Sequence, residues 1–158
     1  MIPEAPFLFS LAALNASMAG LAGLVAGLRR GADLDAINYF RLRQIVEFAF
    51  ANVLFSVGII PLEMLTASLD ASVRIGAALA FVYGLGNALI LSRRLRVHGI
   101  ETIGRWYQAV IALNLGLLIV VVATIVSGSF AMYALLLIVL LARPMLAFLF
   151  VLQSFEQP

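Results

Sequence analysis

The sequence has no cysteine, no lysine and a single histidine, His98, and it is poor in charge. Without cysteine the chain has no disulfide, zinc–thiolate or iron–sulfur ligands. One histidine cannot supply both axial ligands of a membrane b-type haem. Charged residues make up 11% of the chain, whereas soluble domains have roughly 25%. These absences argue against a soluble enzyme and predict no cofactor and no metal.

Hydrophobic residues take the place of the missing charge, at 64% of the chain with a mean hydropathy of +1.11. Five apolar runs of about 18–24 residues are each long enough to cross a bilayer as a helix, and none alternates like a barrel strand. The expected spans are 7–28, 45–66, 73–92, 107–126 and 130–153. The sequence therefore predicts one integral membrane domain, residues 1–158, folded as an all-α polytopic bundle of five transmembrane helices.

The arginines predict the orientation of this bundle. Eight of them lie in the segments 29–44 and 93–106, whereas the other connections hold only Arg74 and an uncharged Ser127-Gly128-Ser129 turn. The positive-inside rule then places the N-terminus outside and the C-terminus in the cytoplasm. Because the arginines lie at span ends, the net charge of +2 does not predict nucleic-acid binding. Exclusive use of arginine among much alanine, leucine and glycine favours a bacterial inner membrane.

The first span is expected to remain in the protein. A signal peptide has a basic segment before its apolar core, whereas here Glu4 precedes the first apolar run and Arg29–Arg30 follow it.

A shift of 64 residues overlays the first two spans on the next two without a gap. It places Arg29–Arg30 on Arg93–Arg94, Gln44 on Gln108 and Gly20 on Gly84. One interpretation is a tandem parallel repeat of two hairpins followed by a single C-terminal helix. The other is that any two membrane hairpins share arginine-rich inner loops.

Small residues form stripes at helical spacing on two spans. One stripe on the third span comprises Gly76, Ala80, Gly84 and Ala88, and the first span carries two stripes: Ala12, Ala16 and Gly20, and Ala19, Gly23 and Gly27. Small residues at this spacing let helix backbones approach closely in lipid. Packing within one subunit is the favoured interpretation, and contact between copies is the alternative.

Each of the first four spans carries one asparagine, and a polar group inside the membrane needs a partner or a role. At about 1.5 Å per residue, Asn52, Asn87 and Asn114 are expected roughly 8–10 Å from the inner ends of their spans, with Asn15 further toward the outside. Hydrogen bonding between helices is the favoured interpretation. The alternative is a polar layer that lines a cavity for an ion, water or a small substrate.

Arg143 and Glu63 are the least ordinary polar residues. Arg143, which precedes Pro144, costs about 2.5–3.5 kcal/mol at the membrane centre, and we expect it to pair with Glu47 and fix the fifth helix to the second. Asn52, Ser56 and Glu63 share one face of the second helix, which would suit an aqueous path. The favoured interpretation is that Glu63 reaches the outer surface and meets Arg74.

No phosphate loop, catalytic triad or metal-ligand pair appears in the sequence. The first hypothesis is therefore a non-catalytic membrane protein that acts by oligomerisation or as a subunit of a membrane complex, with the bilayer and a second copy or partner protein as its contacts. The alternative is a small channel or transporter that uses Asn52, Asn87, Asn114 and Arg143. An intramembrane enzyme is the least favoured hypothesis.

Overall fold

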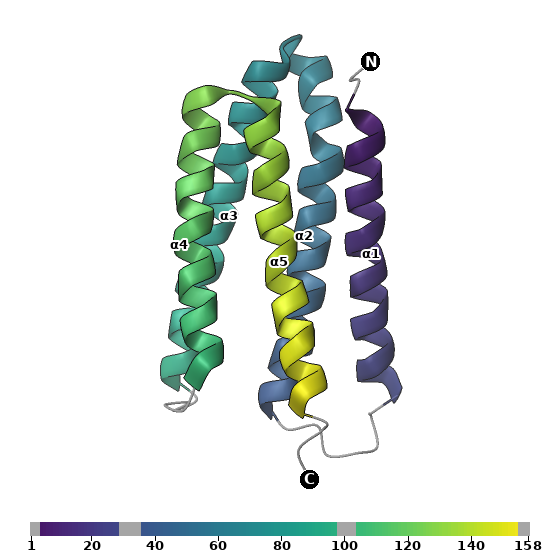
Figure 1. The fold of residues 1–158 in the computed structure, drawn as a ribbon, viewed down its shortest axis with the longest axis vertical. Helices are drawn as coiled ribbons and strands as arrows, with labels where there is room; N and C mark the ends of the chain where they lie inside the picture. Colours follow the sequence, from purple (N-terminus) through teal and green to yellow (C-terminus); the bar gives the residue numbers. More distant parts are fainter. Residues whose placement is uncertain (1–3, 29–35, 98–103, 155–158) are drawn as a thin grey trace. The chain divides into compact units, whose positions relative to one another are not determined.

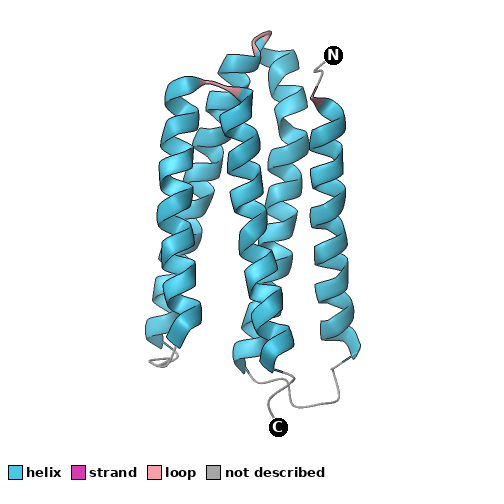
Figure 2. Ribbon diagram, viewed as in Figure 1, coloured by secondary structure: helices cyan, strands magenta, loops and turns pink. Residues whose placement is uncertain are grey.

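The computed structural model describes residues 4–28, 36–97 and 104–154, and the side chains of residues 4–27, 38–90 and 112–153. Within these ranges the chain is helical and contains no strand (Figure 2). The helices are α1 (Ala5–Leu28), α2 (Ala36–Thr66), α3 (Leu69–Val97), α4 (Gly104–Ser127) and α5 (Phe130–Ser154) (Figure 1). The predicted all-α fold is therefore confirmed, and the described ranges contain five helices. That all five cross a membrane stays a prediction.

Four stretches of these helices are long and apolar enough to cross a membrane: Ala5–Gly27, Asn38–Thr66, Leu69–Ile90 and Phe130–Gln153. In α4 the described part, Ala112–Ser127, is apolar but shorter. The helices α2 and α3 are not limited to their apolar runs. Both helices continue beyond the expected spans, because the backbone hydrogen-bond ladder does not stop where polar side chains begin.

Polar side chains form the connection between α2 and α3. The N–H of Ala67, which has a left-handed φ of 52°, donates to the Glu63 carbonyl at 2.8 Å and ends α2. The Ser68 hydroxyl then accepts the N–H of Ala71 at 3.3 Å, which is the bonding of a helix N-cap. The Thr66 and Ser72 hydroxyls lie 2.7 Å apart and tie the two helix ends together.

The predicted tight turn between α4 and α5 depends on Gly128. This residue has a φ of +64°, and its N–H donates to the carbonyl of Thr124 at 2.8 Å. A Cβ atom at Gly128 would lie 2.5 Å from Oδ1 of Asp70, in the first turn of α3. The backbone conformation and the close approach of Asp70 both favour glycine at this position.

Backbone contacts divide the chain into two compact units. The first unit comprises Met1–Pro61 and Leu137–Pro158, and the second comprises Leu62–Leu136. In the first unit α1, α2 and the C-terminal part of α5 surround a core of Ala22, Leu42, Ile45, Ala147 and Val151. In the second unit α3 packs along α4, and Val73, Ala77, Val121 and Tyr133 are buried. The single-domain assignment stays a prediction.

Candidate functional site

A pair of buried amides links the three helices of the first unit. Nδ2 of Asn52 donates to Oδ1 of Asn15 at 3.2 Å and to the carbonyl of Leu137 at 3.1 Å. Nδ2 of Asn15 donates to the carbonyl of Leu11 at 2.8 Å, one turn back along α1. Both asparagine side chains are at most 1% exposed. One amide of α2 thus reaches α1 and α5 together, which stabilises helix contacts in an apolar interior.

The expectation that Asn15 lies at a different level from Asn52 is therefore wrong. The predicted depth of Asn52 is measured from residue 45, where the apolar run begins. Because α2 itself begins at Ala36, Asn52 lies about 24 Å along the helix at about 1.5 Å per residue. Asn15 lies about 20 Å from the end of α1 at Leu28 by the same measure, so the two amides can meet.

One turn beyond Asn52 on α2, the Ser56 side chain is also fully buried. Oγ of Ser56 and Oδ1 of Asn52 have no hydrogen-bond partner among the described residues. A buried polar atom left without a partner costs about 1–3 kcal/mol. A small polar partner such as water would therefore stabilise these two oxygens.

Glu47 and Arg143, the two charged residues predicted to pair, each have another close contact. Oε1 of Glu47 accepts a hydrogen bond from Nε of Arg43 at 2.6 Å, in an exposed pair one turn apart on α2. Arg143 is 5% exposed, and its Cζ lies 3.8 Å from the centre of the Phe48 ring. A desolvated cation over an aromatic face contributes about 2 kcal/mol. The Glu47–Arg143 ion pair stays a prediction.

The Arg143–Phe48 contact has a counterpart on the same two helices. Cζ of Arg41 on α2 lies 5.8 Å from the centre of the Phe150 ring on α5, and Nη1 lies 3.5 Å from the Phe150 carbonyl. In each helix the arginine precedes the phenylalanine by seven residues, which is about two helical turns. Each of the two helices therefore places an arginine on a phenylalanine of the other.

We call Arg41, Phe48, Arg143 and Phe150 the reciprocal Arg–Phe pair. The prediction from sequence does not include this pair, because it assigns Arg143 a carboxylate partner, Glu47. The available signal is the Arg-x6-Phe spacing shared by α2 and α5.

Glu63, which lies in the second unit, is half-buried. The predicted contact with Arg74 does not form, because Nη2 of Arg74 lies 3.3 Å from Oδ2 of Asp70, one turn back on α3. No ion pair joins Glu63 within the described side chains. Since Asn52 and Ser56 belong to the first unit, a continuous polar face that ends at Glu63 stays a prediction.

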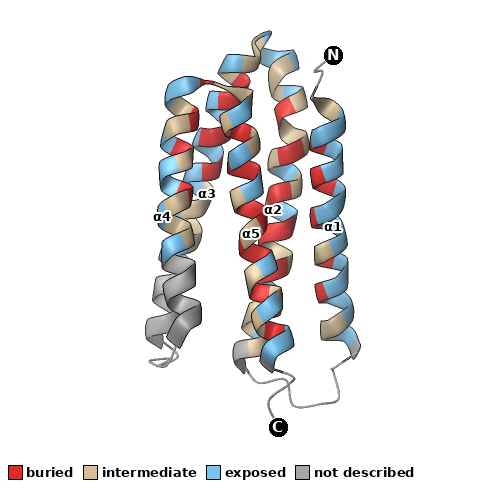
Figure 3. Cartoon of the chain, viewed as in Figure 1, coloured by how far each residue is buried: buried red, intermediate tan, exposed pale blue. Residues whose placement is uncertain are grey.

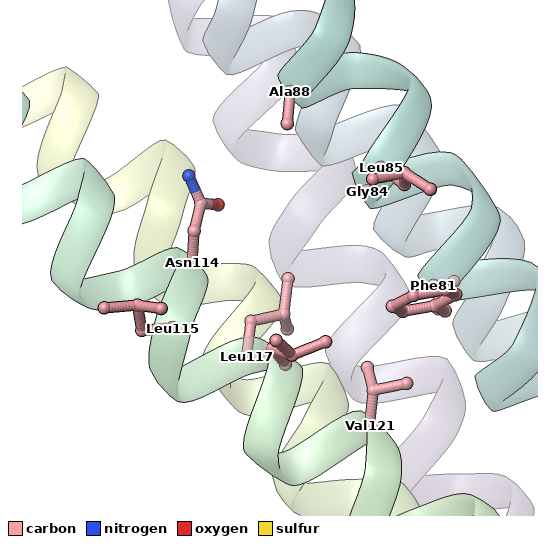
Figure 4. A pocket seen from close by; sticks show the side chains of 10 residues that line it. Phe81, Gly84, Leu85, Ala88, Asn114, Leu115, Leu117 and Val121 are labelled. Carbon is pink, nitrogen blue, oxygen red and sulfur yellow. The ribbon is translucent and has the colours of Figure 1, made fainter.

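The other two asparagines of the predicted polar layer lie in the second unit. Nδ2 of Asn87 lies 3.4 Å from the Tyr83 hydroxyl, one turn back on α3. Asn114 on α4 lines a pocket of about 280 Å³ that also includes Gly84 and Ala88 of α3 (Figure 4). The single polar layer across all helices stays a prediction, because these two residues belong to a different unit from Asn15 and Asn52.

The predicted packing residues fall into three environments. Gly76 and Ala80 are buried, and a Cβ atom at Gly76 would lie 2.9 Å from the Tyr133 hydroxyl oxygen. Gly84 and Ala88 line the pocket between α3 and α4. Cβ atoms built at three glycines of α1 would meet nothing within 4 Å: Gly20, Gly23 and Gly27.

The open glycines of α1 belong to a larger exposed face. At 3.6 residues per turn they share one side of the helix with three other exposed small residues. We call this side the small-residue face of α1: Ala13, Ala16, Ser17, Gly20, Gly23 and Gly27. The buried residues of the same helix, Leu8, Asn15 and Ala22 among them, lie on a different side by the same spacing. Figure 3 shows buried and exposed residues on different sides of α1. The small-residue face is therefore exposed.

No known protein family, curated protein or solved structure matches the chain. Among the described side chains no three His, Cys, Asp or Glu residues gather as metal ligands would. The proposals that follow therefore depend on the geometry alone.

Proposed function

We propose that the chain is a multi-pass protein of the bacterial inner membrane, with its N-terminus outside, that acts without catalysis through lateral assembly. The assembly is either an oligomer of this chain or a membrane complex in which it is a subunit. The observation that carries the proposal is the small-residue face of α1, which is exposed, and whose three glycines have open space where a Cβ atom would lie.

The membrane location is supported by the outer surface of the helices. Large apolar side chains are exposed on every helix, for example Leu21, Leu54, Leu85, Ile119 and Leu149. Leu54 and Ile119 are 71% and 70% exposed. Soluble monomers rarely expose contiguous apolar patches beyond a few hundred Å², whereas a bilayer surrounds such surfaces with hydrocarbon. Four helices of sufficient length and hydropathy agree with this.

Assembly is supported by the contrast between glycines. Lipid tails are as apolar as leucine, so helices associate in a membrane by close packing, which small residues permit. The α1 face has three pairs of small residues four apart: Ala13 and Ser17, Ala16 and Gly20, and Gly23 and Gly27. Gly76 meets Tyr133 of the same chain. The α1 glycines have open space, as do Gly58, Gly84, Gly86 and Gly116. The α1 glycines also share one exposed side of their helix with three other small residues, and a helix of another subunit would fit there.

The helix bounds also support the tandem repeat. α1 begins at Ala5 and α3 at Leu69, and this separation equals the 64-residue shift that aligns the two hairpins. Each hairpin would then supply one pair of helices, with α5 as the additional C-terminal helix.

The test is the mass of the protein in nanodiscs taken directly from native membranes. We expect a closed oligomer or a complex of defined mass for the natural sequence, and the monomer mass for Gly20→Leu. Gly86→Leu is the matched control, because Gly86 is also a helical glycine with open space around it. The mass measured for Gly86→Leu should equal that of the natural assembly. A monomer for the natural sequence, or no change with Gly20→Leu, would contradict the proposal.

One observation favours a second candidate, a small channel or carrier. Oδ1 of Asn52 and Oγ of Ser56 are buried without a partner in the described residues, as polar groups that line a solute path would be. Solute flux in liposomes that disappears with Asn52→Leu would support this function. An absence of flux over a panel of small ions and polar solutes would argue for assembly alone.

A further inference from the structure

Building on the proposed membrane location, we infer that the pocket between α3 and α4 binds a single-chain neutral lipid. The apolar chain would occupy the space between the helices. The one polar group of the lipid, a hydroxyl or a neutral carbonyl, would hydrogen bond to the amide of Asn114.

Missing side-chain volume on α3 creates the pocket. Ala80, Gly84 and Ala88 follow one another at four-residue spacing on the side of α3 that faces α4 (Figure 4). A Cβ atom at Gly84 would meet nothing within 4 Å. Across the gap, Leu117 and Val121 of α4 supply apolar walls. The two helices pack against each other and yet leave about 280 Å³ between them.

The size of the pocket selects a slender ligand. Sites for drug-sized molecules enclose roughly 300–1,000 Å³, and this pocket lies just below that range. One hydrocarbon chain fits such a space better than a two-chain phospholipid. Leu85 and Leu115 line the pocket and are exposed, so it is open to the hydrocarbon that would surround the helices. Lipid can therefore enter sideways from the bilayer.

Asn114 determines the chemistry of the polar group. Among the described side chains that line the pocket it is the one polar group, and none of these described side chains is charged. Its amide, which can both donate and accept, forms no hydrogen bond with the described residues and points into the gap (Figure 4). A neutral hydroxyl or carbonyl satisfies such an amide. A phosphate or carboxylate would find no cation among the described side chains that line the pocket.

A photoactivatable long-chain alcohol, with a diazirine in its alkyl chain, tests the inference in nanodiscs. We expect the label on α3 and α4 peptides that line the pocket. Gly84→Leu should reduce this labelling at least fivefold by filling the space, and the open surroundings of Gly84 allow it to fold. Gly86→Leu adds the same bulk beside the pocket without lining it, and should leave labelling unchanged.

The role of Asn114 is tested with Asn114→Leu and two probes. Affinity for the alcohol should fall by about 2–10-fold, the factor expected for one hydrogen bond. A matching alkane probe without the hydroxyl should bind the natural sequence and the variant equally. Labelling that persists in Gly84→Leu, or that spreads evenly over the exposed helix surfaces, overturns the site. Equal alcohol affinity in Asn114→Leu overturns the assigned polar contact.

The mass of the assembly, measured on the same nanodiscs, keeps this test separate from the proposed function. A correct assembly mass without pocket labelling refutes the lipid site alone. Failure of the protein to insert into nanodiscs refutes the membrane location, and the lipid site with it.

Discussion

Alanine at Gly76 should destabilise the second unit, whereas alanine at Gly84 on the same helix should not. A Cβ atom at Gly76 would lie 2.9 Å from the hydroxyl oxygen of Tyr133 and 3.0 Å from its Cε2. Tyr133 is 1% exposed, so its ring has little room to withdraw. A Cβ atom at Gly84 would meet nothing within 4 Å.

The magnitude follows from two opposing effects. Replacing a helical glycine by alanine favours the helix by up to about 1 kcal/mol. Overpacking a well-filled core costs about 1–3 kcal/mol. Gly84→Ala should show only the gain in helix stability. Gly76→Ala should show both this gain and the cost of overpacking. The free energy of unfolding should therefore be about 1–3 kcal/mol lower for Gly76→Ala than for Gly84→Ala.

Reversible unfolding by SDS in mixed micelles measures this difference. Adding Tyr133→Phe to Gly76→Ala removes the nearest atom but leaves ring carbons at 3.0 and 3.2 Å, so it should restore only part of the loss. Equal unfolding free energies for Gly76→Ala and Gly84→Ala would refute the packing of Tyr133 on Gly76.

Three further predictions concern other contacts and are tested by the same unfolding assay. Asn52→Leu removes two hydrogen bonds and should cost about 1–2 kcal/mol. A double-mutant cycle with Asn15→Leu should return a coupling of about 0.6–1.7 kcal/mol, and zero coupling would contradict the pairing. Phe48→Leu should lower the free energy of unfolding by about 1–2 kcal/mol. The loss should exceed that of Phe150→Leu, because the Phe48 ring lies 3.8 Å from Cζ of Arg143, whereas the Phe150 ring lies 5.8 Å from Cζ of Arg41. Equal losses would show that the difference in distance is unimportant. Gly128→Ala should cost at least about 1–2 kcal/mol from its left-handed φ alone, so unchanged stability would exclude the turn as described.

The helices could be predicted from the sequence because continuous apolar runs carry a strong signal of their own. The apolar runs alone do not locate the helix ends, since α2 starts at Ala36, well before its apolar run. Because α2 starts earlier than its apolar run, Asn52 lies at the level of Asn15 and hydrogen bonds to it. The depth of a residue, when it is counted from the end of an apolar run, therefore carries any error in the position of that end.

Side-chain partners across helices were harder to predict. The buried Arg143 was recognised as unusual from its charge and position, but charge alone suggested a carboxylate. Phe48 became a candidate only when the antiparallel register of α2 and α5 was known. The division of the small residues into packed Gly76 and open Gly20 likewise depends on which neighbours reach each helix face, and one helix sequence does not contain that information.

Position-dependent cross-linking in native membranes tests the central claim, assembly through α1, most directly. Because the chain has no cysteine, a single substitution accepts a benzophenone maleimide at a known position. Gly20→Cys and Gly27→Cys place the cross-linker on the small-residue face, and Leu21→Cys places it on an exposed position of another side. We expect adducts larger than the monomer from the first two positions and not from Leu21→Cys. Monomer alone from all three, or equal adducts from all three, would contradict assembly through this face.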